Sequence, residues 1–222
     1  MNSSNLDLDQ ARFNMVEQQI RTWEVFDLDV LDILQNTPRE NFVPDKYKSI
    51  AYSEIEIPLD HGVKMLSPMI QGHLLQALEI KNTDVVLEIG TGTGYVTAML
   101  AKLAMHVYSI DFYKEAIALT TKNLKNLNIQ NVSTETGDAS QGWKDQGPYN
   151  AIAVNGSMNE VPQTIKEQLK LGGRLFVIEG KAPTMLAKLI TRSGPKQWDE
   201  HVLFETTVPP LLNCGATPQF IF

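Results

Sequence analysis

Apolar side chains recur every three or four positions in the first third of the chain, which predicts amphipathic helices there. Residues 9–21 and residues 28–34 both show this spacing, and Asp27, just before the second stretch, is suited to cap a helix. Residues 51–69 show no clear period and are expected to form an irregular loop with short extended pieces. A further helix is predicted over residues 68–79, because proline fits the first helical turn.

The pattern changes near residue 83, where short apolar runs begin to alternate with helical stretches. VVLEIG and HVYSID are such runs, and VSTETGD, YNAIAVNG and GRLFVIEG are further candidate strands. The helical stretches between them include TAMLAKLA, YKEAIALTTKNLKNL and TIKEQLK. Strands that alternate with helices form a mostly parallel sheet with helices on both faces. The sequence therefore predicts an α/β fold of the doubly wound type.

The C-terminal part has no helix between its last two predicted strands. EHVLFETTVPP and PQFIF, residues 200–210 and 218–222, are expected to pair as an antiparallel hairpin at the edge of the sheet. We expect residues 1–80 to form a helical N-terminal extension that packs on a main domain of residues 81–222 as one structural unit. Four aromatic side chains, those of Trp23, Phe26, Phe42 and Trp143, are expected to pack in the interior.

Composition and charge narrow the range of partners. The net charge of −7 argues against a surface that follows nucleic-acid phosphates, because such a surface needs clustered Lys and Arg. No apolar run approaches the ~20 residues of a membrane span. The only cysteine, Cys214, excludes an internal disulfide and fits a cytoplasmic location. Histidines are scattered without the spacing of a zinc site, so no metal is expected.

Three glycines stand at alternate positions in EIGTGTGY, directly after a predicted strand. Glycine allows positive φ and lets a ligand approach the main chain closely, so Gly90, Gly92 and Gly94 indicate a ligand at this strand–helix turn. The spacing is one residue shorter than that of a dinucleotide-binding motif. Tyr95 and Val96 stand where a P-loop needs Lys and Ser or Thr, which argues against nucleoside triphosphates.

Acidic residues lie at the ends of three predicted neighbouring strands. Glu88 precedes the glycines, Asp111 ends the second strand, and Asp138 follows the third. A carboxylate at Asp111 is suited to accept hydrogen bonds from ribose hydroxyls, and one at Asp138 to meet an adenine amino group. Each of them alone could instead be a helix cap or a loop acid. Together they suit a ligand with a ribose, an adenine and a positive charge, and S-adenosylmethionine has all three.

These motifs resemble the Rossmann-type methyltransferases, and a wider set resembles the protein-L-isoaspartate O-methyltransferases. The set comprises PRENFVP, AYSEIEIPLDHG, VVLEIGTGTGY, VYSID and LKLGGRLFVIEG, and the resemblance covers the chain from about Met15 to Gly180. The resemblance implies S-adenosylmethionine as cofactor and methyl transfer to the side-chain carboxylate of isoaspartyl residues in damaged proteins. The candidate cofactor-binding residues are Glu88, Gly90, Thr91, Gly92, Gly94, Asp111, Phe112, Asp138 and Ala139.

The loop that the family uses for its acceptor differs in this chain. The family reads G-x-T-I-S-x-P, whereas residues 61–68 read HGVKMLSP, so Leu66 stands at the family's serine. Ser67 comes one position late, and in extended backbone a slip of one residue turns a side chain to the opposite face. Candidates for contact with the acceptor are therefore His61, Ser67 and Asn155, although Asn155 and Ser157 could equally close a turn. The first 45 residues lead into this loop and are expected to cover the cleft.

The expected chemistry requires little machinery. A carboxylate with a pKa of ~4 is ionised at neutral pH, so it can attack a sulfonium methyl without a general base. Positioning the reactants is then the main task, and no triad is expected. Three functions remain open: methylation of isoaspartyl residues, methylation of another small-molecule or protein carboxylate acceptor, and a module that binds the cofactor without turnover. The sequence leaves the oligomeric state open.

Overall fold

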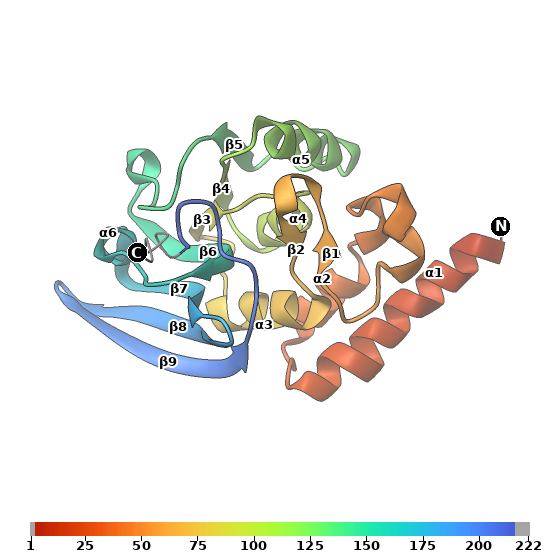
Figure 1. The fold of residues 1–222 in the computed structure, drawn as a ribbon, viewed down its shortest axis with the longest axis horizontal. Coiled ribbons are helices and arrows are strands. Elements are labelled where there is room, and N and C mark those ends of the chain that lie inside the picture. The colour runs from red at the N-terminus through yellow and green to blue at the C-terminus, as the bar shows by residue number, and fades with distance from the viewer. Residues whose placement is uncertain (1–2, 216–222) are drawn as a thin grey trace, which may run out of the picture.

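A seven-stranded sheet forms the centre of the molecule (Figure 1). The structure, a computed structural model, describes residues 3–215 of the 222. The strands of the sheet, in chain order, are β3 (Val85–Ile89), β4 (His106–Asp111), β5 (Val132–Thr136), β6 (Tyr149–Met158), β7 (Leu169–Lys181), β8 (Thr184–Gly194) and β9 (Gln197–Thr206). They lie side by side in the order β5-β4-β3-β6-β7-β8-β9.

The sheet is parallel from β5 to β7 and antiparallel from β7 to β9. The predicted doubly wound fold with an antiparallel C-terminal edge is therefore confirmed. The pairing at that edge differs from the prediction, because β9 pairs with β8 and the sequence pattern did not indicate β8. PQFIF, the predicted partner, lies outside the described residues.

Helices connect the parallel strands and build the N-terminal extension. They are α1 (Ser3–Asn14), α2 (Leu28–Gln35), α3 (Pro68–Leu78), α4 (Tyr95–Leu103), α5 (Lys114–Asn126) and α6 (Gln163–Glu167). A π-helical turn, Met15–Ile20, continues α1. Asp27 caps α2 as expected, since its side chain accepts hydrogen bonds from the amides of Asp29 and Val30. Among residues 3–215, no helix is both long and apolar enough to cross a bilayer.

Each face of the sheet has its own apolar core, because successive side chains of a strand point to opposite faces. On β3, Val86 belongs to the core beneath α2, α3, α4 and α5, and Leu87 belongs to the core on the opposite face with α6. The first core also contains Met15 and Leu34 of the N-terminal extension. The extension and the sheet therefore share one hydrophobic core.

Two of the aromatic side chains that were expected inside are exposed. Trp23 is 53% exposed and Phe26 is 66% exposed, so this prediction is wrong for both, while Phe42 is buried and Trp143 is partly buried. Trp23 ends the irregular helical stretch that follows α1, and Phe26 lies in the connection to α2, where the chain turns at the surface. The apolar spacing of residues 9–21 was extended to Trp23, but the regular helix ends before this residue. The spacing therefore wrongly predicted that Trp23 faces the core.

Candidate functional site

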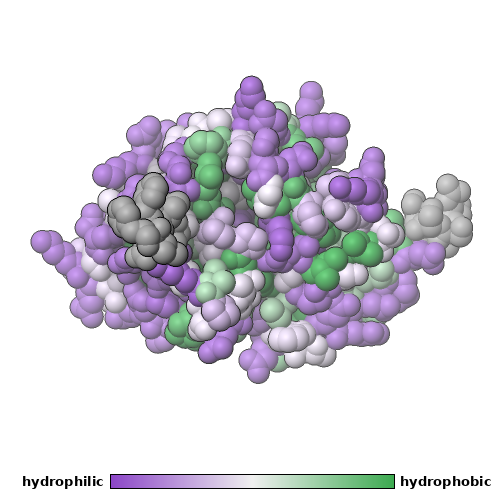
Figure 2. Space-filling model, in the orientation of Figure 1, coloured by the Kyte–Doolittle hydropathy of each residue, from purple (hydrophilic) through white to green (hydrophobic). Residues whose placement is uncertain are grey.

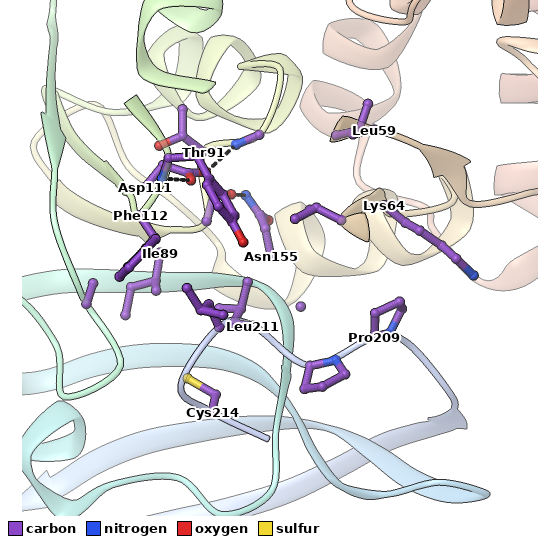
Figure 3. Close-up of a pocket in the computed structure, with 18 of the residues that line it drawn as sticks. Leu59, Lys64, Ile89, Thr91, Asp111, Phe112, Asn155, Pro209, Leu211 and Cys214 are labelled. Carbon is purple, nitrogen blue, oxygen red and sulfur yellow. Dashed lines mark hydrogen bonds between the residues drawn. The ribbon is translucent and has the colours of Figure 1, made fainter. Parts of the chain in front are cut away.

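A cleft of about 590 Å³ opens at the carboxyl ends of the parallel strands. The chain leaves β3 toward β4 and β5 on one side, and β6 lies on the other side of β3. This reversal of strand order is where ligands bind in doubly wound sheets. Figure 3 shows side chains from the ends of β3, β4 and β6 converging on the cleft, with the C-terminal segment opposite them.

The glycine loop, residues 90–94, forms the floor of the cleft. Gly90, Gly92 and Gly94 all have positive φ, at 88°, 58° and 84°. Gly90 and Gly92 line the cleft, but Gly94 lies behind it, where a Cβ atom would come within 2.8 Å of the Thr120 side chain. The first two glycines thus expose main chain to a ligand, and the third allows close packing of α5 on the loop.

Asp111 lies at the end of β4 and lines the cleft beside this loop. Its Oδ2 accepts a hydrogen bond from the Gly92 amide at 2.9 Å, and its Oδ1 accepts one from the Tyr113 amide at 2.9 Å. Both oxygens are therefore fixed by the backbone, and each has a second lone pair for a ligand hydroxyl. Phe112, which follows, is 47% exposed and lies at the rim.

Asp138 lies beyond β5 on the same side of the cleft, next to the buried Ala139. Its carboxylate accepts hydrogen bonds from the Ser140 amide and from Asn213 Nδ2, at 2.9 and 2.8 Å. Partial burial acts in the opposite direction, but these hydrogen bonds lower the pKa of Asp138. The side chain is therefore ionised at neutral pH and fixed in position.

Glu88 differs from the other two acids, because it is fully buried beneath the glycine loop and does not line the cleft. It accepts hydrogen bonds from Thr97, Ser109 and Asn155. Burial raises the pKa of Glu88 to about 7 despite these bonds. Its contact with the cleft is indirect and passes through Asn155, which does line the cleft.

The acceptor loop, residues 61–68, forms the opposite wall. It contains the second strand of a two-stranded hairpin, in which β2 (Lys64–Met65) pairs with β1 (Ile57–Pro58). The turn of this hairpin places Leu59 3.7 Å from where a Cβ atom of Gly92 would lie. Of the three acceptor candidates, His61 and Asn155 line the cleft, whereas Ser67 is buried outside its lining. The His61 ring stacks on Tyr113, with centroids 4.2 Å apart, and so bridges the acceptor loop to the start of α5.

Lys64 stands at the family's threonine position but its side chain is directed away from the centre of the cleft. Its Nζ atom forms an ion pair with Glu56 at 2.8 Å, and Figure 3 shows the side chain pointing away from Asn155. Met65 and Leu66 are buried and line this end of the cleft. The acceptor end is therefore mainly apolar along the loop itself.

The segment of residues 207–215 forms a third wall that the sequence did not indicate. Ser157 of β6 holds it, because its amide donates to the Pro209 carbonyl, its hydroxyl donates to the Val208 carbonyl, and its own carbonyl accepts from the Leu211 amide. Leu211 reaches Gly90, where a Cβ atom would lie 3.0 Å from its Cδ2. Cys214 also lines the cleft, and burial raises the pKa of its thiol to about 11.

The N-terminal segment does not cover the cleft. The described residues that line it begin at Leu59, so the expectation for the first 45 residues is wrong. These residues instead pack beneath the acceptor loop, where Arg39 donates to the Leu66 carbonyl at 2.8 Å.

On the face seen in Figure 2, hydrophobic residues reach the surface in small groups separated by hydrophilic ones.

Comparison with known proteins agrees with this geometry. The sequence model of the protein-L-isoaspartate(D-aspartate) O-methyltransferase family matches residues 10–208. A protein-L-isoaspartate O-methyltransferase from Brucella anthropi is 31% identical, with 96% of this chain and 98% of that protein covered. Another, from Vibrio campbellii, is 38% identical, with 83% of this chain and 88% of that protein covered.

Solved structures are similar over the same length. A protein-L-isoaspartate O-methyltransferase structure has a TM-score of 0.77 at 25% identity, with 92% of this chain and 67% of that chain covered. A structure from Plasmodium falciparum, determined with S-adenosyl-L-homocysteine, has a TM-score of 0.78 at 21% identity, with 90% of this chain and 97% of that chain covered, and shares the fold. Since the family model matches residues 10–208, which include Asp111 at the end of β4 and Asp138 beyond β5, the chain belongs to the protein-L-isoaspartate O-methyltransferase family.

Proposed function

We propose that this protein transfers a methyl group from S-adenosylmethionine to the carboxylate of an isoaspartyl residue in a protein or peptide. One observation carries the proposal. The cleft extends without interruption from the glycine loop and Asp111 to the acceptor loop at Met65 and Leu66. A donor and an acceptor can therefore meet in one cavity, as direct displacement requires.

The residues at the donor end fit the cofactor. Gly90 and Gly92 present main chain without side chains, and Asp111 offers a fixed carboxylate for two ribose hydroxyls. Asp138 lines the same cleft, which supports a role for its carboxylate in accepting a hydrogen bond from the adenine amino group. When bound, S-adenosylmethionine supplies a methyl group on a positively charged sulfur. Two carboxylates along the cleft favour such a cation.

The protein's own part in the reaction is to position the acceptor and exclude water. The acceptor carboxylate is ionised at neutral pH, so no side chain has to remove a proton. Apolar side chains of Met65 and Leu66 line the acceptor end, and a dry site favours the dispersed charge of a methyl transfer. His61 and Tyr113 narrow the rim by stacking.

A matched pair of peptides tests the proposal. The protein is incubated with methyl-labelled S-adenosylmethionine and a peptide that contains either isoaspartate or aspartate at one position. We expect base-labile label on the isoaspartyl peptide and little on the aspartyl peptide. Cofactor binding by calorimetry, without transfer to either peptide, would contradict the proposed function.

The apolar acceptor loop favours a second candidate, methyl transfer to a carboxylate in a different acceptor. Leu66 provides no hydroxyl where the family has one, and Ser67 does not reach the cleft. Equal labelling of both peptides, or labelling of a small carboxylic acid alone, would support this candidate. For either acceptor we propose a cytoplasmic location, since one cysteine in the chain suits a reducing compartment.

A further inference from the structure

Arg39 is a buried cation that forms no ion pair with the residues that the structure describes. Its side chain is 0% exposed. Glu54 acts on it electrostatically, but Glu54 is exposed and accepts the Met69 amide at 3.0 Å. Burial lowers the pKa of Arg39 only to about 10, so it is charged at neutral pH.

Neutral groups surround the guanidinium. One nitrogen donates to the carbonyl of Leu66 in the acceptor loop, at 2.8 Å, and another donates to Oε1 of Gln71 on α3. The guanidinium lies over the Tyr95 ring, 5.2 Å from its centroid. Its Nε atom is buried without a partner in the described part of the chain. Buried charges are normally paired, so this arrangement favours an anion nearby.

Gln71 connects this cation to the cleft. It is 2% exposed and lines the cleft. A guanidinium can only donate, so Gln71 must present its oxygen to Arg39 and its NH₂ group elsewhere. No described residue accepts a hydrogen bond from that NH₂ group, and the group is not fully enclosed by protein atoms. The amide therefore offers a free donor at the acceptor end.

Tyr95 provides another hydrogen-bond donor that has no described acceptor, like Arg39 Nε and the Gln71 NH₂ group. The residue is 2% exposed, lines the cleft and packs its ring under the Arg39 guanidinium, and its buried hydroxyl has no hydrogen-bond partner among residues 3–215. Burial raises the pKa of Tyr95 to about 12, so the hydroxyl keeps its proton. Arg39, Gln71 and Tyr95 together give one positive charge and unused N–H and O–H groups, which is the complement of a carboxylate.

We propose that the Gln71 amide, held by Arg39, donates a hydrogen bond to the carboxylate of the methyl acceptor and so replaces the hydroxyl that is missing at Leu66. The inference rests on the proposed function. One carboxylate oxygen accepts from Gln71. The other forms a bond to the methyl carbon as the carbon–sulfur bond breaks, the electron pair stays on sulfur, and no proton is transferred. Gln71 determines specificity by direct contact, and Arg39 is a positioning residue.

Gln71→Glu separates this role from a structural one. The substitution gives Arg39 a counter-ion of nearly the same shape, so the melting temperature should be unchanged or higher. It also removes the N–H donor and adds a negative charge, so KM for the isoaspartyl peptide should rise at least tenfold, with a smaller change in kcat and an unchanged Kd for S-adenosylhomocysteine. Gln163→Glu, an exposed site on α6, is the charge-matched control. A wild-type KM in Gln71→Glu would overturn the inference.

A second measurement keeps this inference separate from the proposed function. Succinate is titrated into the wild-type protein saturated with S-adenosylhomocysteine, and the side-chain amide signals of Gln71, assigned with Gln71→Leu, are followed by NMR. We expect a saturable shift with succinate and none with succinamide. A wild-type protein that ignores isoaspartyl peptides but shows this shift would refute only the proposed function. Absence of the shift would refute the role of Gln71.

Discussion

Asn155 Nδ2 donates hydrogen bonds to Oε1 of the buried Glu88, at 2.7 Å, and to the carbonyl of Gly90, at 2.9 Å. One amide on β6 thereby ties a buried carboxyl group of β3 to the first residue of the glycine loop. Burial raises the pKa of Glu88 to about 7, so this connection contains a group that titrates near neutral pH. The shape of the donor end therefore depends on a side chain that does not itself line the cleft.

The first prediction concerns the pH dependence of stability. The pKa of Glu88 is about 7 in the folded state and near its ordinary value of 4.5 in the unfolded chain, so the folded state binds more protons between these values. Stability should fall as pH rises through this window, by about 3 kcal/mol in total. In Glu88→Gln this component should disappear. Urea unfolding of both proteins at pH 4.5, 6 and 8 checks it, and parallel profiles would contradict it.

The second prediction concerns Asp111. Asp111→Ala removes the carboxylate that we propose as acceptor for the ribose hydroxyls, and a hydrogen bond to a charged group contributes about 1.5–3 kcal/mol. The Kd for S-adenosylhomocysteine, measured by calorimetry, should therefore rise by roughly 10- to 150-fold. Asp145→Ala removes an exposed carboxylate and should leave the Kd unchanged. If both variants bind alike, Asp111 has no role in binding the ribose.

The third prediction compares two glycines that both have positive φ. At Gly62 a Cβ atom would meet nothing within 4 Å, whereas at Gly94 it would lie 2.8 Å from Thr120 Cγ2. Gly62→Ala should cost about 1–2 kcal/mol in backbone strain alone. Gly94→Ala should cost about 1–3 kcal/mol more, because it also overpacks the contact with α5.

The free energies of unfolding of both glycine variants are measured in urea. Adding Thr120→Ala to Gly94→Ala should recover part of the extra loss, because only the Thr120 Cβ atom would remain close. Equal losses at the two glycines would show that Thr120 does not restrict position 94.

The parallel part of the fold follows from the sequence, whereas the antiparallel part does not. The inner parallel strands β3, β4 and β6 carry apolar runs because both of their faces are covered, whereas the edge strand β5, VSTET, is only partly buried. On β8 the buried residues Met185, Ala187 and Ile190 do not alternate regularly, because the pairing with β9 shifts register after Ala187. The period of two that identifies a half-buried strand is therefore broken.

Those residues of the candidate site could be predicted whose role follows from their own residue type and their place at a strand end. Gly90, Gly92, Asp111 and Asp138 follow from strand ends and residue types. Leu211 and Cys214 could not be predicted, since the bonds of Ser157 to the C-terminal segment join residues more than 50 positions apart. The one available signal was the small pair Gly156 and Ser157: a Cβ atom on Gly156 would lie 2.8 Å from Leu211.

The fourth prediction restores the family's residue in the acceptor loop. Leu66→Ser adds a hydroxyl at a position that lines the cleft, so kcat/KM for the isoaspartyl peptide should rise severalfold. Leu66 is 3% exposed, and its truncation should lower the free energy of unfolding by about 2–5 kcal/mol. Steady-state kinetics at 20 °C and urea unfolding measure the two effects. No gain in kcat/KM, in a protein that is still folded, would show that a hydroxyl here does not reach the acceptor.

The wall formed by residues 207–215 contains the chain's single thiol. A maleimide fluorophore would therefore label one known position at the cleft without any engineered mutation. Because the pKa of Cys214 is raised to about 11, labelling should be slow at pH 7.5 and faster under alkaline conditions. Protection of this thiol from alkylation would give a direct optical readout of what enters the cleft, suited to screening libraries of unidentified acceptors.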